Sequence, residues 1–157
     1  MKITCISIGK TDEDYLRAGI QKYIDRLKFY STITCIEIPD IQKSKKLSIQ
    51  EQKKQECEKI IKKIPAQSSV FLLDEKGTQY TSINFSNIID NCNNTGIKEI
   101  CFIIGGPYGF SDDMYKKGYK KISFSKMTFS HQMIRLFLFE QIYRAYTIIN
   151  GTPYHHE

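Results

Sequence analysis

The feature that most constrains the fold of this 157-residue chain is a regular alternation of short apolar runs with longer, partly polar segments. The apolar runs lie at residues 2–8, 31–38, 69–74 and 99–104, and the more polar "YKKISFS" (119–125) is expected as a fifth strand. Most are β-branched or almost wholly apolar, which is typical of buried strands. Each run is followed by a segment with helical signals. A strand–helix order repeated along the whole chain predicts an α/β fold with a parallel sheet and helices on both faces.

The first two intervening segments carry clear helix starts. Residues 12–28 place apolar side chains on one face at helical periodicity, and Thr11 or Asp12 can cap this helix. Ser48 and Glu51 have the spacing of a capping box, in which each residue satisfies a backbone N–H of the other. The sequence therefore predicts a second, more peripheral helix that begins at Ser48.

Three further helices are predicted in the rest of the chain. The turn "EKGTQY" (75–80) precedes a helix that Ser82 can cap and that stops at "NNTG". A short helix is expected over 111–117. The last helix is expected over 131–150, where Gly151 ends it.

The last helix is apolar on nearly every side. A helix of this kind is buried on both sides. In a domain this small, the second side predicts a subunit interface and therefore a homodimer. Phe139 and Tyr143 lie on that second side. Arg135, which interrupts the apolar surface, requires a carboxylate or phosphate partner there.

Length and charge indicate one basic domain over residues 1–157. The formal net charge is +6 and the pI is near 9.0. Eight Lys against three Glu occur between Lys43 and Lys63, and five Lys without an acidic residue occur between Lys116 and Lys126. This pattern predicts a polyanionic partner such as RNA, although a solvated lysine face would produce the same pattern.

Composition argues against several other classes of protein. The five cysteines contain no CxxC pair, and Cys and His are not clustered, so we expect reduced, packed thiols and no metal site. No apolar run reaches the roughly 18 residues needed to span a membrane. The first residues, "MKITCISIGK", lack the long apolar region of a signal peptide. We therefore expect a cytoplasmic protein with no membrane or metal partner.

Three loops follow the carboxyl ends of predicted strands, where parallel sheets bind ligands. They lie after Leu73-Asp74, at Gly105–Gly109 and at Ser123–Ser130. The paired glycines of "IIGGPYG" allow the backbone to approach a ligand with positive φ, or simply make a tight turn. The apolar residues of "SFSKMTFS" could line a purine pocket, or could be core residues beside hydroxyl caps. The pattern alone leaves both interpretations open.

Five stretches, taken in order, carry a resemblance to a known family. They read "KITCISIGK", "FLLDEKG", "FIIGGPYGF", "SFSKMTFSHQMIR" and "EQIYRAYTIINGTPYH". Together they resemble the ribosomal RNA large subunit methyltransferase H family of the SPOUT superfamily, over essentially the whole chain. The resemblance implies a parallel-sheet SPOUT fold with a C-terminal trefoil knot. It also implies S-adenosylmethionine as the methyl donor, bound by a homodimer.

The resemblance also implies a substrate and a set of donor contacts. The substrate is N3 of a pseudouridine in 23S ribosomal RNA, methylated within the assembled 70S ribosome. The donor-binding residues that it implies are Leu73, Gly105, Phe124, Ser125, Lys126, Met127, Thr128 and Phe129. These residues belong to the three loops that the strand pattern singles out.

The acceptor site implied by the resemblance consists of Arg144, Tyr154 and His155. A guanidinium fork suits a phosphate or a base carbonyl, and Tyr154 in an extended tail could stack on a base. His155 is the candidate for accepting the N3 proton; alternatively, it only contacts RNA and water takes the proton. His131 is interpreted as a structural residue at the helix start. The family usually has Pro where this chain has Ser130.

Two other functions stay open on the sequence. A non-catalytic RNA-binding protein would use the same basic surface but would bind no methyl donor. A small-molecule nucleotide enzyme with a flavodoxin-like sheet would bind its ligand without any dependence on RNA.

Overall fold

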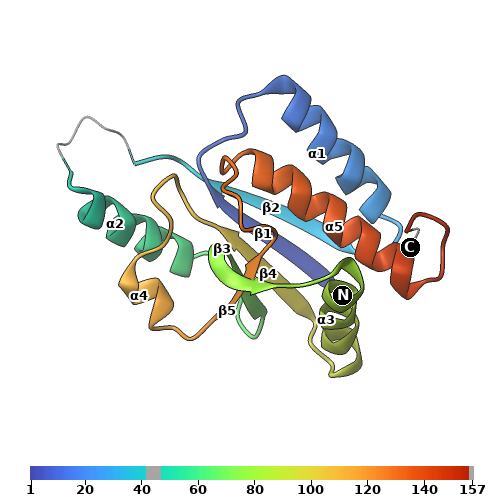
Figure 1. The fold of residues 1–157 in the computed structure, drawn as a ribbon. Helices are drawn as coiled ribbons and strands as arrows, with labels where there is room; N and C mark the ends of the chain where they lie inside the picture. Colours follow the sequence, from blue (N-terminus) through green and yellow to red (C-terminus); the bar gives the residue numbers. More distant parts are fainter. Residues whose placement is uncertain (42–46, 156–157) are drawn as a thin grey trace.

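The computed structural model describes residues 1–41 and 47–155 and contains one five-stranded sheet (Figure 1). The strands are β1 (Lys2–Ile8), β2 (Thr32–Ile38), β3 (Ser69–Gln79), β4 (Glu99–Ile104) and β5 (Lys120–Ser123). Their order is β2-β1-β4-β3-β5, and every neighbouring pair is parallel. The predicted α/β fold with a parallel sheet is therefore confirmed. Lys43, Lys45 and Lys46 of the predicted basic segment, and His156, lie outside the described residues.

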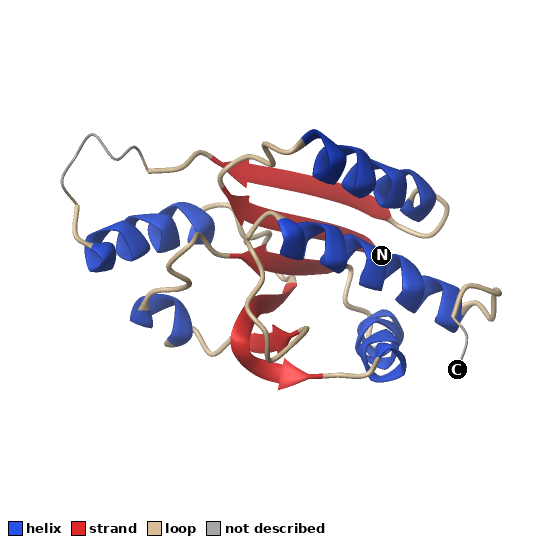
Figure 2. Ribbon diagram, turned by 45° about the horizontal axis from the view of Figure 1, so that its top comes forward, coloured by secondary structure: helices blue, strands red, loops and turns tan. Residues whose placement is uncertain are grey.

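Helices cover both faces of the sheet, as the strand–helix alternation predicts (Figures 1 and 2). They are α1 (Asp14–Leu27), α2 (Ile49–Ile61), α3 (Ser82–Asn94), α4 (Asp112–Tyr115) and α5 (Met133–Ile149). Along β4, Phe102 and Ile104 pack with α1, α3 and α5, whereas Cys101 and Ile103 pack with α2 and α4. Successive residues of a strand point to opposite faces, so one apolar strand supplies both cores.

The start of α1 differs from its prediction. The helix begins at Asp14, and the preceding Glu13 makes no side-chain capping bond. Neither Thr11 nor Asp12 caps it: the hydroxyl of Thr11 accepts a hydrogen bond from Arg135 at 2.9 Å, and the carboxylate of Asp12 accepts one from Gln132 at 3.2 Å. A long-range contact has replaced the local cap.

The starts of α2 and α3 depend on local hydroxyl caps. At α2 the predicted capping box is confirmed, since Ser48 Oγ accepts from the N–H of Glu51 and the Glu51 carboxylate accepts from the N–H of Ser48. At α3 the cap is Thr81, which accepts from the N–H of Asn84 at 3.1 Å. The prediction of Ser82 as the cap was therefore wrong by one residue.

The predicted turn at 75–80 is wrong, because β3 continues to Gln79 and curls round β5 (Figure 2). Ile122 of β5 is in register with both Leu73 and Thr78 of β3. At Gly77 an added Cβ would lie 2.6–2.7 Å from backbone atoms of Ile122 and Lys121. A glycine is needed here because the two backbones cross in close contact.

Helix α5 packs against the sheet between α1 and α3. Phe139 is only 2% exposed and belongs to the core of this chain, so its placement on a subunit interface was wrong. Tyr143 is partly buried against Tyr23 of α1. Phe137 is 36% exposed and is the large apolar residue that α5 leaves on the surface. Neighbouring helices therefore cover much of the surface that the sequence assigned to a partner.

Three simple observations complete the fold. The five cysteines are free thiols, and four of them are buried. In residues 1–41 and 47–155, no group of three or more His, Cys, Asp or Glu residues is arranged to hold a metal ion. No helix of this part of the chain is long and apolar enough to cross a membrane.

Candidate functional site

A cavity of about 450 Å³ lies at the carboxyl ends of β3, β4 and β5. The three loops singled out by the sequence meet there, which is where parallel sheets place ligands. Seven of the eight predicted donor-binding residues line this cavity, and Lys126 does not. The seven are Leu73, Gly105, Phe124, Ser125, Met127, Thr128 and Phe129. Their contact with a donor stays a prediction.

The loop after β4 is a tight turn whose backbone faces the cavity. The N–H of Gly109 donates to the carbonyl of Gly106 at 3.0 Å, and the positive φ lies at Gly109 rather than at the glycine pair. An added Cβ at Gly105 would meet Phe110 at 3.2 Å, and one at Gly106 would meet the Glu56 carboxylate at 2.8 Å. Both glycines are therefore needed for packing behind the loop, and the expected positive φ at the pair was wrong.

The loop after β5 is closed by its own hydroxyl groups. Ser123 Oγ donates to the carbonyl of Ser125 at 2.8 Å, and Ser125 Oγ accepts from the N–H of Met127 at 2.9 Å. Ser130 Oγ accepts from the N–H of Met133 at 3.1 Å. The residue that stands where the family usually has Pro therefore satisfies a backbone donor at the start of α5.

Aromatic residues hold the same loop against the two flanking helices. Phe124 packs edge-on against Phe85 of α3, with ring centroids 6.0 Å apart. Phe129 packs edge-on against Phe137 of α5 at 5.0 Å. Met127 is 75% exposed at the cavity rim. The loop thus supplies an apolar wall whose outer edge is open to solvent.

Several residues that line the cavity were not predicted. Asp74 and Glu75 follow directly after the central part of β3, and Tyr115 of α4 donates from its hydroxyl to Asp74 at 2.5 Å. Burial, together with this carboxylate, raises the pKa of Tyr115. Lys53 of α2 and His131 also reach the cavity. Asp74 and Glu75 could have been suspected from their place after a strand, whereas Tyr115 and Lys53 arrive only through tertiary packing.

Two titratable groups at the cavity, the buried Glu56 and the half-buried His131, have shifted pKa values. Burial raises the pKa of Glu56, whose carboxylate lies behind Gly106 and accepts from Gln52 at 2.9 Å. Burial, and secondarily the charge of Arg135, lowers the pKa of His131. Neutral pH therefore favours the uncharged imidazole at one end of the cavity.

The three predicted acceptor residues lie together near the C-terminal end of α5, whereas the cavity lies near its N-terminal end. The Arg144 guanidinium donates to Glu140 at 2.5 and 3.0 Å and lies 3.4 Å from His155 Nδ1. The ring of Tyr154 lies 4.8 Å from the Arg144 guanidinium and packs edge-on against Tyr143. The tail is therefore folded onto α5, and its description as an extended segment was wrong.

The cavity and the cluster around Arg144 are separate within one chain. Ile134 lines the cavity, and Arg144 lies ten residues further along the same helix. At 1.5 Å per residue, this is about 15 Å along the helix axis. The cavity can hold a ligand that combines an apolar ring with polar groups. The cluster offers a guanidinium and an imidazole for an anion or a proton.

Comparison with known proteins identifies close relatives. A family model described as predicted SPOUT methyltransferase matches residues 1–155. The ribosomal RNA large subunit methyltransferase H of Christiangramia forsetii is 50% identical over 156 residues, which cover 99% of each chain. The protein of the same name from Parabacteroides distasonis is 50% identical over 157 residues, all of both chains.

Among solved structures the similarity is more remote. One such structure is a ribosomal RNA small subunit methyltransferase E from Neisseria gonorrhoeae, bound to S-adenosyl methionine. The structural alignment covers 90% of this chain and 65% of that chain. The TM-score is 0.46 and the identity is 15%.

Proposed function

The chain belongs to the ribosomal RNA large subunit methyltransferase H family of SPOUT methyltransferases, and we propose that it methylates N3 of a pseudouridine in 23S ribosomal RNA. The methyl donor is S-adenosylmethionine, and the substrate is the assembled 70S ribosome in the cytoplasm. One observation carries the proposal: in a chain 50% identical to its relatives over their full length, seven of eight expected donor-binding residues line one cavity.

The cavity has the composition that this donor requires. When bound, S-adenosylmethionine supplies a methyl group on a positively charged sulfur. Leu73, Ile104 and Phe129 offer apolar surface for a purine ring. The carboxylates of Asp74 and Glu75 offer acceptors for hydroxyl or ammonium groups and favour a cationic ligand.

The cluster around Arg144 is proposed as the acceptor side. The attacked ring nitrogen carries a proton that must leave, and His155, whose Nδ1 lies 3.4 Å from Arg144, is the proposed acceptor. Arg144 would bind a phosphate or a base carbonyl, while Glu140 fixes its orientation through two hydrogen bonds. The ring of Tyr154 packs on Arg144 and holds the tail there. This contact keeps His155 beside the guanidinium. The proposed role of Tyr154 is therefore positioning rather than stacking on a base.

A homodimer would bring the two halves of the site together. A two-fold axis near the middle of α5 would place the Arg144 cluster of one copy beside the cavity of the other. Exposed apolar residues at the cavity end of α5, namely Met127, Phe129 and Phe137, supply the surface for such contact. We further propose that the C-terminal part of the chain forms a trefoil knot, and the curl of β3 round β5 supports this.

Two measurements test the proposal. Calorimetry should detect binding of S-adenosylmethionine and of its demethylated product. Tritium from labelled donor should then enter 23S RNA in ribosomes that lack the modification, and should not enter ribosomes that already carry it. Donor binding without transfer to RNA would indicate a small-molecule enzyme. Ribosome binding without donor binding would indicate a non-catalytic RNA-binding protein.

A further inference from the structure

The positive charge of the chain is concentrated in two segments. Residues 48–63 and 111–126 contain ten Lys against five Asp or Glu. The rest of the chain contains thirteen Lys or Arg against twelve Asp or Glu. Nearly all of the net charge of +6 therefore comes from α2, α4, β5 and the residues that flank them.

Seven of these ten lysines belong to α2, α4 and the residues beside them, which lie together on one side of the molecule, whereas Lys120 of β5 lies near Cys92 of α3 on the other face. Helices α2 and α4 contact each other on the face of the sheet opposite α5 (Figures 1 and 2). Between them is a groove of about 380 Å³. The residues that line it are Lys54, Cys57, Glu58, Ile61, Asp113, Lys116 and Lys117. The groove is thus separate from the surface proposed for the second subunit.

Most lysines of this face have no acidic partner. Of its exposed lysines, only Lys116 forms an ion pair within the described chain, with Asp113 at 3.5 Å. On α1, by contrast, Arg17 is paired with Asp14, and Lys28 just beyond the helix is paired with Asp25. The α2–α4 face therefore presents lysines without ion-pair partners and a small excess of positive charge, seven Lys against five Asp or Glu over residues 48–63 and 111–117, whereas much of the charge around α1 is neutralised locally.

The groove adjoins the cavity and lacks aromatic residues. Consecutive residues of α2 serve the two sites, because Lys53 lines the cavity and Lys54 lines the groove. Single-stranded RNA is bound by stacking its bases on aromatic side chains. Lysines without aromatic residues instead suit the phosphates of a nucleic-acid backbone.

We propose that the groove between α2 and α4 docks the phosphate backbone of ribosomal RNA beside the donor cavity. The inference rests on the proposed function and adds the surface by which the substrate is held. Backbone contacts of this kind position the RNA without reading its sequence. Each phosphate that is bound should contribute about one unit to the salt dependence of binding.

The test compares two double variants of equal charge. Lys54→Glu with Lys117→Glu reverses two lysines of the groove, and Lys22→Glu with Lys98→Glu reverses two exposed lysines elsewhere. The groove variant should raise the KM for unmodified ribosomes at least tenfold and should leave kcat and donor affinity within twofold. Its affinity for ribosomes should depend less steeply on salt, by about two units of slope. The control variant should change KM less than threefold.

The outcomes separate this inference from the proposed function. If the wild type methylates ribosomes and the two variants have equal KM, the groove does not dock RNA. If the groove variant still binds protein-free large-subunit RNA as tightly as wild type does at low salt, the partner is an acidic ribosomal protein and the inference is overturned. If the wild type binds no donor, the proposed function fails, while the comparison of RNA affinities still tests the groove.

Discussion

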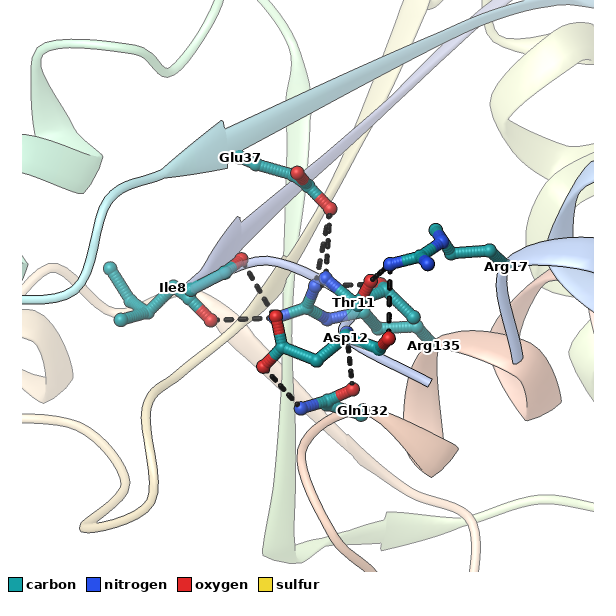
Figure 3. Close-up of polar contacts among 8 residues, drawn as sticks. Ile8, Thr11, Asp12, Arg17, Glu37, Gln132 and Arg135 are labelled. Carbon is teal, nitrogen blue, oxygen red and sulfur yellow. Dashed lines mark hydrogen bonds and ion pairs between the residues drawn. The ribbon is translucent and has the colours of Figure 1, made fainter. Parts of the chain in front are cut away.

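The guanidinium of Arg135, near the start of α5, donates to the carbonyl of Ile8 at 2.6 Å, at the end of β1 (Figure 3). The same side chain donates to Gly9 at 3.0 Å and to Thr11 at 2.9 Å, and lies 3.4 Å from Glu37. Arg135 therefore satisfies the end of one strand and fixes the start of the helix beside the cavity. The predicted carboxylate partner exists, but it lies within this chain.

Replacement of Arg135 tests this role. Arg135→Met keeps much of the side-chain volume but leaves buried carbonyl groups without donors, so the free energy of unfolding should fall by about 3–5 kcal/mol. Arg17→Met removes an exposed arginine that also donates to Thr11 and should cost less than about 1 kcal/mol. Urea unfolding measures both. An Arg135 variant as stable as the Arg17 variant would contradict the role.

The same residues show what sequence patterns could and could not predict. The cap at Ser48 was predictable because its partner Glu51 lies three residues away. The cap at Thr11 failed because Arg135, 124 residues away, takes the hydroxyl. The positions of most strands could be predicted from their apolar runs. The end of β3, past Gly77, could not, because its sequence is that of a polar turn. Only its pairing with β5 makes that segment a strand.

The candidate site, too, could be predicted from the sequence only in part. The loops after Leu73, Gly105 and Ser123 could be predicted, because the carboxyl ends of neighbouring parallel strands lie at one edge. Tyr115 and Lys53 could not, because α2 and α4 reach the cavity only by packing on the sheet. Local patterns therefore locate the site, and the tertiary fold supplies its remaining walls.

A second prediction concerns the glycine loop. In Gly105→Val the added atoms would press on Phe110 and on the backbone of Gly109, and would displace a cavity wall. The variant should fold, and its affinity for S-adenosylmethionine should fall more than tenfold, about 1.4 kcal/mol or more. Gly96→Ala strains a glycine with φ of +76° away from the cavity and should leave affinity unchanged. Wild-type affinity in folded Gly105→Val would refute the assignment.

A third prediction concerns pH. Because burial raises the pKa of Glu56, the folded chain holds this proton more tightly than the unfolded chain does. This contribution to stability is complete below the usual value of 4.5 and is lost as pH rises through the folded pKa. Glu56→Gln should therefore melt at a higher temperature than wild type at neutral pH, and the difference should vanish toward pH 4.5.

The matched control for this prediction is Glu58→Gln on the exposed side of the same helix. Its melting temperature relative to wild type should not change between these pH values. If Glu56→Gln raised the melting temperature as much near pH 4.5 as at neutral pH, the charge of the carboxylate would not be the cause of the increase.

A fourth prediction concerns the proposed dimer. Phe137→Glu would bury a charge without a partner if this exposed end of α5 meets a second subunit, so the variant should be monomeric and inactive on ribosomes. Phe29→Glu changes a side chain that is 88% exposed in the connection from α1 to β2 and should stay dimeric. Light scattering decides, and a monomeric wild type at micromolar concentration would rule out the dimer.

The last prediction separates donor binding from transfer. Deletion of residues 153–157 removes Tyr154 and His155, which lie on Arg144 and away from the cavity of the same chain. Calorimetric affinity for S-adenosylmethionine should stay within about threefold, less than 1 kcal/mol. Tritium transfer to unmodified ribosomes should fall at least about a hundredfold, the scale of lost positioning or proton transfer.

Tyr154→Phe is the control for packing of the tail. It keeps the ring on Arg144 and removes only the hydroxyl that contacts Glu140 at 3.2 Å and Tyr23 at 3.3 Å. Transfer should then stay within about fivefold of wild type, since a hydrogen bond of this kind contributes about 1 kcal/mol. A deletion variant that methylates normally would show that the tail has no part in transfer. A deletion variant that stays folded and dimeric but also loses the donor would place the tail at the donor cavity of the second copy.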